Sequence, residues 1–92
     1  MDKQAITKHK SSIPTKVDIT LKEHVSKIMQ QYFSNLDGEE PKNVYDFFMD
    51  EVEEPLVMIV MKHTNQNQSE TARILGLSRG TLRMLLKKFG LL

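Results

Sequence analysis

The twenty residues from Gln68 to Lys87, QSETARILGLSRGTLRMLLK, decide the fold of this chain. Within this stretch Ala72 stands at the fifth position, Gly76 at the ninth, and Leu82 and Leu85 at the fifteenth and eighteenth. A small residue allows two helices to cross closely, and glycine adopts the left-handed conformation of a tight turn at little cost. The spacing therefore predicts a helix-turn-helix.

Capping residues mark the starts of both helices in this unit. Asn67 precedes the first helix, which we expect to end at Leu75, and Ser78 precedes the second, over about residues 79–88. At about 100° per residue, the second helix has two faces. One face is apolar, and the other carries Arg79, Gly80, Thr81, Arg83, Met84, Lys87 and Lys88. A cationic outer face is typical of a recognition helix, which docks in the major groove of DNA.

Two further helices are predicted upstream. Thr20-Leu21-Lys22-Glu23 matches a capping box, and an apolar stripe follows it as far as Leu36, before Asp37-Gly38 closes the helix. Asn43 is expected to cap a second helix over about residues 44–63, which contains Pro55. The apolar positions of this helix wrap around more than one face, so it needs a partner to cover it.

The chain is accordingly divided into three segments. Residues 1–19 are expected to form a flexible arm or a weak hairpin, because they mix Lys, Ser, Thr and Pro14 without helical periodicity. Residues 20–64 supply two dimerisation helices, and residues 65–92 form the helix-turn-helix. A 92-residue monomer would have a marginal core, which favours an intertwined dimer.

The net charge is only +1, but positive and negative residues are strongly segregated along the chain. Residues 1–36 carry six Lys against three acids, residues 37–61 carry eight acids against one Lys, and residues 62–92 carry six Lys and Arg against one Glu. The basic last third suggests an anion-binding face, with nucleic acid as the first candidate ligand.

The composition and the sequence motifs also argue against several other classes of protein. Hydrophobic residues make up 39% and charged residues 27% of the chain, as in ordinary globular proteins, and there is no Cys. No apolar run approaches the ~18 residues of a membrane span, and the first residues lack a signal-peptide core, so an intracellular protein is expected. The three His residues lack metal-ligand spacing, and no nucleophile elbow or P-loop is present. We expect no enzyme, cofactor or metal.

The run from Asn67 to Arg83, together with Lys87-Lys88-Phe89-Gly90, resembles the Fis (factor for inversion stimulation) family of bacterial nucleoid-associated proteins. The same segment is similar to the C-terminal DNA-binding domain of nitrogen-regulation-type activators. The segments 31–36 (QYFSNL) and 51–56 (EVEEPL) also resemble Fis, and they favour the Fis family over the activators.

The resemblance implies an all-α fold with four helices per chain, an intertwined dimer core and two helix-turn-helix units. It implies a nucleoid-associated transcriptional regulator that binds and bends double-stranded DNA at degenerate sites, because the recognition helices lie closer together than one turn of B-DNA, ~34 Å. Stimulation of site-specific recombination is a further implied role. RNA polymerase and a DNA invertase are further candidate partners, and the implied location is the cytoplasm, at the nucleoid.

The family's DNA contacts can be carried over residue by residue. Arg79 would read guanine, and Thr81 and Arg83 would contact base or backbone. Phosphate contacts would come from Asn67, Ser69, Ser78, Lys87 and Lys88, although Asn67, Ser69 and Ser78 also suit helix capping. Glu70, Met84 and Leu85 depart from the cations of family members, which should reduce the salt dependence of binding.

Two alternatives remain open at this stage. The chain could be a protein-interaction or dimerisation module whose helix-turn-helix binds a protein through Met84 and Leu85. It could also be a narrow, operator-specific repressor on the same scaffold.

Overall fold

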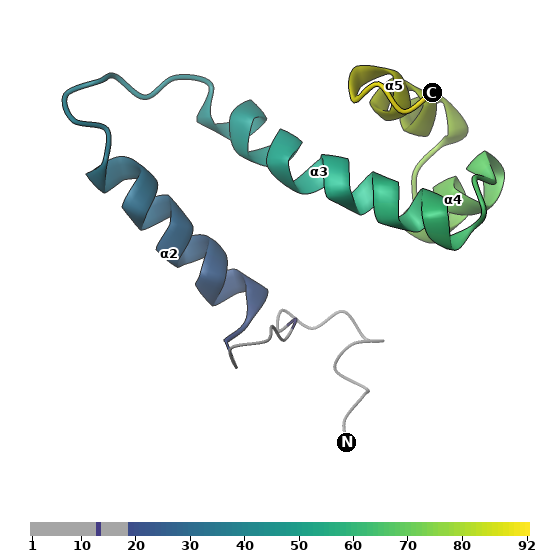
Figure 1. Ribbon diagram of the computed structural model, residues 1–92, viewed down its shortest axis with the longest axis horizontal. Helices are drawn as coiled ribbons and strands as arrows, with labels where there is room; N and C mark the ends of the chain where they lie inside the picture. The colour runs from purple at the N-terminus through teal and green to yellow at the C-terminus, as the bar shows by residue number, and fades with distance from the viewer. Residues whose placement is uncertain (1–12, 14–18) are drawn as a thin grey trace. The chain divides into compact units, whose positions relative to one another are not determined.

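The computed structural model describes residue 13 and residues 19–92, which contain four helices and no β-strand (Figure 1). The helices are α2 (Leu21–Ser34), α3 (Val44–His63), α4 (Gln68–Leu75) and α5 (Arg79–Lys88). This confirms the predicted all-α fold. The chain divides after Lys42 into two compact units, which are considered separately below.

The first unit contains α2, which begins at the predicted capping box. Thr20 Oγ1 accepts a hydrogen bond from the Glu23 N–H, and Glu23 Oε1 accepts one from the Thr20 N–H, both at 3.1 Å. The predicted end was wrong, because the helix stops at Ser34 instead of continuing through Leu36. The Ser34 hydroxyl donates to the Gln30 carbonyl at 2.9 Å, and Asp37 and Gly38 adopt left-handed conformations that a helix cannot contain.

The predicted arm or hairpin over residues 1–19 lies outside the described residues, apart from Ile13 and Ile19. The Ile13 carbonyl accepts a hydrogen bond from the Leu21 N–H at 2.8 Å, next to the start of α2.

In the second unit, α3 has the predicted bounds and continues through Pro55. Asn43 is the N-cap residue, as predicted, but it is left-handed (φ 51°) and its side chain makes no capping hydrogen bond. A side-chain cap requires extended backbone at the capping residue, which points the side chain toward the first N–H groups of the helix. Asn43 contributes only its carbonyl, which accepts from the Phe47 N–H at 3.0 Å.

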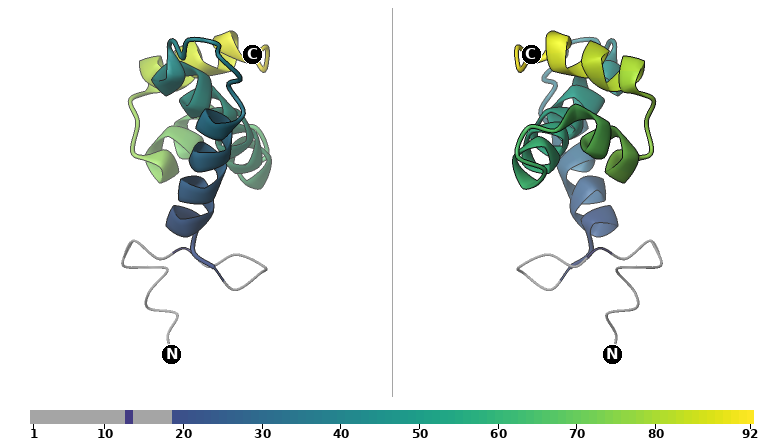
Figure 2. Two further views of the ribbon diagram at one scale, coloured as in Figure 1. Left: turned by 90° about the vertical axis from the view of Figure 1, so that its left-hand side faces the viewer. Right: turned by 90° about the vertical axis from the view of Figure 1, so that its right-hand side faces the viewer.

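The core of the second unit joins the C-terminal half of α3 to α4 and α5 (Figures 1 and 2). Its buried apolar side chains are Val57, Met61, Ala72, Leu82 and Leu86, with Leu75, Leu85 and Leu91 packed against them. Thr71 is the buried polar residue among them, and its hydroxyl lies 2.7 Å from that of Thr64. This hydroxyl pair ties the end of α3 to α4.

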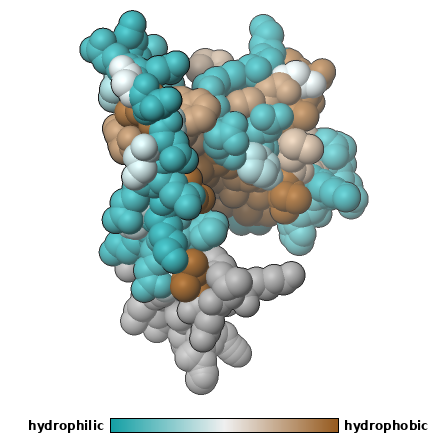
Figure 3. All heavy atoms as spheres, turned by 60° about the vertical axis from the view of Figure 1, so that its left-hand side comes forward, coloured by the Kyte–Doolittle hydropathy of each residue, from teal (hydrophilic) through white to brown (hydrophobic). Residues whose placement is uncertain are grey.

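A second face of α3 is not covered within its unit. Tyr45, Val52, Leu56 and Ile59 are 76%, 38%, 48% and 64% exposed, and their spacing places them along one stripe of the helix. In Figure 3, hydrophobic residues, drawn in brown, form part of the visible surface. On α2, similarly, no residue is buried. Among the described residues, no helix combines the length and the apolar character that a membrane crossing requires.

The turn between α4 and α5 depends on Gly76, which has φ 76°. We predict that Gly76→Ala lowers the free energy of unfolding by about 1 kcal/mol, because an L side chain is strained in this conformation although nothing lies within 4 Å of the added Cβ. Thermal melting measures the loss. Gly80→Ala is the matched control: Gly80 is helical, its new Cβ would meet Ser78 Oγ at 4.0 Å, and helix propensity should make the change neutral or stabilising. Equal destabilisation by both variants would contradict the prediction.

Candidate nucleic-acid interface

The two helices of the helix-turn-helix are both capped as predicted. Asn67 Oδ1 accepts from the Glu70 N–H at 2.9 Å, and Ser78 Oγ accepts from the Thr81 N–H at 3.1 Å. The Ser78 hydroxyl also donates to Thr81 Oγ1 at 3.0 Å. These side chains therefore fix the starts of α4 and α5, and the Thr81 hydroxyl keeps its own O–H donor for a ligand.

The predicted division of α5 into two faces is present. Leu82 and Leu86 are fully buried, whereas Arg79, Thr81, Arg83 and Lys87 are exposed. Within the described ranges, Arg79 and Lys87 have no hydrogen-bond or ion-pair partner, so both charges are uncompensated. Met84, one of the departures from the family's cations, is 67% exposed on the same helix.

Arg83 is held by a residue that the sequence analysis did not select. Its Nη1 donates to Gln68 Oε1 at 3.0 Å, which links α5 to the first turn of α4 across fifteen residues. Local periodicity gives no sign of this pair. The pair could have been predicted from the geometry of a helix-turn-helix, in which the start of the first helix lies beside the middle of the second.

Lys88 is paired with an acid on α3. Its Nζ lies 2.7 Å from Asp50 Oδ1, an oxygen that is itself buried. The contact with the Asp50 carboxylate raises the pKa of Lys88 above its ordinary value; burial opposes the shift, and the charges of Asp50, Glu53 and Asp46 reinforce it. The acidic run of α3 therefore compensates one of the cations for which phosphate contact was predicted.

A second ion pair lies on α4. Arg73 Nε donates to Glu70 Oε2 at 3.1 Å, and Arg73 Nη2 contacts the same oxygen. The hydrogen bond from Arg73 holds the pKa of Glu70 below its usual range, so this carboxylate stays charged at neutral pH.

Two further residues of these helices were predicted to contact phosphate. These are Ser69 and Lys87, and the side chains of both are exposed.

We predict that Glu70→Gln raises DNA affinity about two- to fivefold and steepens its dependence on salt by about one unit, since Arg73 loses its partner and gains a free charge. Fluorescence anisotropy at several salt concentrations measures both quantities. Glu51→Gln is the control, because it removes the same charge from an exposed position on α3. A lower affinity for Glu70→Gln would show that the carboxylate helps binding.

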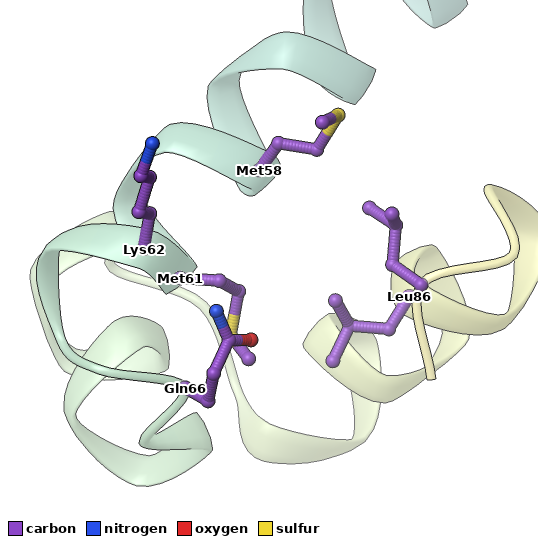
Figure 4. Close-up of a pocket in the computed structure, with 6 residues that line it drawn as sticks. Met58, Met61, Lys62, Gln66 and Leu86 are labelled. Carbon is purple, nitrogen blue, oxygen red and sulfur yellow. The ribbon is translucent and has the colours of Figure 1, made fainter.

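A cavity of about 290 Å³ lies beside the core of this unit (Figure 4). Met58, Met61, Lys62, Gln66, Leu86 and Leu91 line it, so its walls are mostly apolar and it lies on the buried side of α5. Among the described residues, no group of three His, Asp or Glu could hold a metal ion.

Comparison with known proteins points to one family. A family model described as "Bacterial regulatory protein, Fis family" matches residues 48–89, which span the C-terminal part of α3, all of α4 and all of α5. The chain is also similar to the DNA-binding protein Fis of Glaesserella parasuis serovar 5 (strain SH0165). The two are 44% identical over 75 residues, which cover 82% of this chain and 76% of that protein.

Proposed function

Because this chain belongs to the Fis family of bacterial regulatory proteins, we propose that it binds and bends double-stranded DNA as a homodimer. Membership confirms the resemblance inferred from the motif, and also the expectation that the chain is a regulator and not an enzyme. One observation carries the proposal: α5 buries its apolar face against α3 and α4 and presents Arg79, Arg83 and Lys87 on the other, with no acid paired to them among the described residues.

The proposed binding mode places α5 in the major groove. Arg79 is at the first position of the helix, where side chains reach base edges, and a guanidinium can pair with guanine O6 and N7. Thr81 and Arg83 contact base or backbone. Asn67, Ser69, Ser78, Lys87 and Lys88 contact phosphate, and for Lys88 this requires exchange of Asp50 for a phosphate oxygen.

The homodimer is supported by the uncovered stripe of α3. Tyr45, Leu56 and Ile59 are large apolar side chains at 76%, 48% and 64% exposure, and burying them against a second copy would remove this surface from water. In the proposed dimer, residues 20–64 form the shared core and residues 65–92 form one DNA-binding unit on each side. An intertwined core would hold the two recognition helices at a fixed separation.

Bending follows from that separation. If it is shorter than one turn of B-DNA, ~34 Å, both helices can enter major grooves only when the duplex bends and its intervening minor groove narrows. Selectivity would then depend on how easily the central sequence deforms. The proposed roles are those of a nucleoid-associated protein and transcriptional regulator in the cytoplasm. Contact with RNA polymerase, and stimulation of recombination through a DNA invertase, belong to the same proposal.

A gel-shift titration against circularly permuted DNA fragments tests the proposal, with sedimentation of the free protein as a companion measurement. A dimer whose complex changes mobility with the position of the site would support it. Binding without that dependence would favour an operator-specific repressor. Absence of binding at low salt would favour a protein-interaction module, and a monomeric complex would overturn the homodimer.

A further inference from the structure

Within the part of the chain that the structure describes, three cations of the helix-turn-helix unit have side-chain partners, and these partners differ in charge. Arg73 contacts the carboxylate of Glu70, and Lys88 contacts that of Asp50. Arg83 instead contacts the neutral amide of Gln68, at 3.0 Å. A carboxylate partner compensates a positive charge, whereas an amide restricts the side chain and leaves its charge intact. Arg83 is therefore the partnered cation that remains fully available to an anion.

The chemistry of the two side chains fixes the orientation of the contact. A guanidinium has five N–H donors and no acceptor, so the amide must present its oxygen to Arg83. The amide oxygen of Gln68 is then occupied, and Arg83 keeps four of its five N–H donors for other partners. Gln68 is the first residue of α4 and is half-buried, while Arg83 is exposed on α5. Because it is more buried, Gln68 is the more restricted of the two side chains and can anchor Arg83.

We propose that Gln68 is a positioning residue for Arg83, which it holds in a restricted set of conformations for contact with DNA. The inference rests on the proposed function, because Arg83 is assigned there to base or backbone contact. An arginine side chain has many accessible rotamers, and part of the entropic cost of ordering it is met before binding when the side chain is already held. Gln68 thereby acts on DNA affinity through Arg83.

A double-mutant cycle tests the coupling. Gln68→Ala should weaken DNA binding about threefold, the scale of a typical hydrogen bond, and should leave the salt dependence unchanged. In an Arg83→Ala background, the same substitution should have no further effect. An equal loss in both backgrounds would overturn the proposal, since Gln68 would then act independently of Arg83.

Gln68→Glu provides a second readout that a purely structural role would not produce. An acid in the first turn of a helix is favourable, so α4 should remain folded, and melting temperature checks this. The carboxylate would compensate Arg83, which should lower the magnitude of the salt slope by about one unit. Gln66→Glu is the matched control, because it adds the same charge two residues away, outside α4 and without a contact to Arg83 among the described residues. Equal slopes for the two variants would count against the proposal.

Failure of the proposed function and failure of the role of Gln68 would give different experimental results. Absence of DNA binding by the unmodified protein would remove the proposed function and this inference with it. DNA binding with purely additive effects of Gln68 and Arg83 would leave the proposed function in place and overturn the role of Gln68.

Discussion

Leu82→Ala is expected to lower the free energy of unfolding of the second unit by about 2–5 kcal/mol. Leu82 is 0% exposed, and with Leu86 it joins α5 to the buried side chains of α3 and α4. The substitution removes three carbon atoms and leaves a cavity that a close-packed core only partly fills. In a domain of ordinary stability, about 5–15 kcal/mol, this is a large fraction of the total.

Urea denaturation followed by circular dichroism at a fixed protein concentration measures this loss. Met84→Ala is the matched control, because Met84 lies two residues away on the same helix but is 67% exposed. It should change stability by less than about 0.5 kcal/mol. Equal losses for the two variants would mean that Leu82 is not the residue that holds α5 in place.

Where the sequence predicted the fold well, the signals were local. Asn67, Gly76 and Ser78 mark the ends of α4 and α5 through hydrogen bonds and dihedral angles that involve residues at most four positions away. The bounds of α3 were also predicted. The side-chain cap predicted at Asn43 is absent, because a residue type that suits capping does not determine whether its own backbone is extended.

The end of α2 shows the same limitation. An apolar residue at the expected spacing, Leu36, extended the predicted stripe beyond the true helix, which ends at Ser34. The hydrophobic periodicity includes such a residue whether or not the backbone is still helical there. The left-handed conformations of Asp37 and Gly38 were consistent with a chain reversal, and the error concerned its exact placement within four residues.

The candidate site was predictable as a face but not as a set of pairs. The spacing of α5 separated its cations from its leucines, and the structure has the same separation. The partners of Arg83 and Lys88, however, lie 15 and 38 positions away along the chain, beyond any local pattern. The charge pattern separated the acidic segment 37–61 from the basic segment 62–92, whereas Asp50 of the acidic segment has a buried oxygen against Lys88.

Arg79→Ala is expected to reduce strongly the preference for selected DNA sites over random DNA, while deformation of the central sequence supplies the remainder. Arg79 is exposed at the start of α5 and has no partner among the described residues, so its guanidinium is free to contact a base. A bidentate pair with guanine contributes about 1–3 kcal/mol of discrimination, which corresponds to roughly 5- to 150-fold per recognition helix. Competition gel shifts with a site selected by the unmodified protein measure this ratio.

Two further variants separate sequence reading from simple attraction of charges. Lys87→Ala removes a charge of the same sign from the same helix, and it should weaken binding to both DNAs equally while lowering the magnitude of the salt slope by about one unit. Arg79→Lys retains the charge but lacks the planar fork of donors, so it should keep the salt slope and lose the selectivity. Selectivity that is unchanged by Arg79→Ala would exclude Arg79 as the reader of guanine, and deformation of the central sequence would then have to supply all of the discrimination.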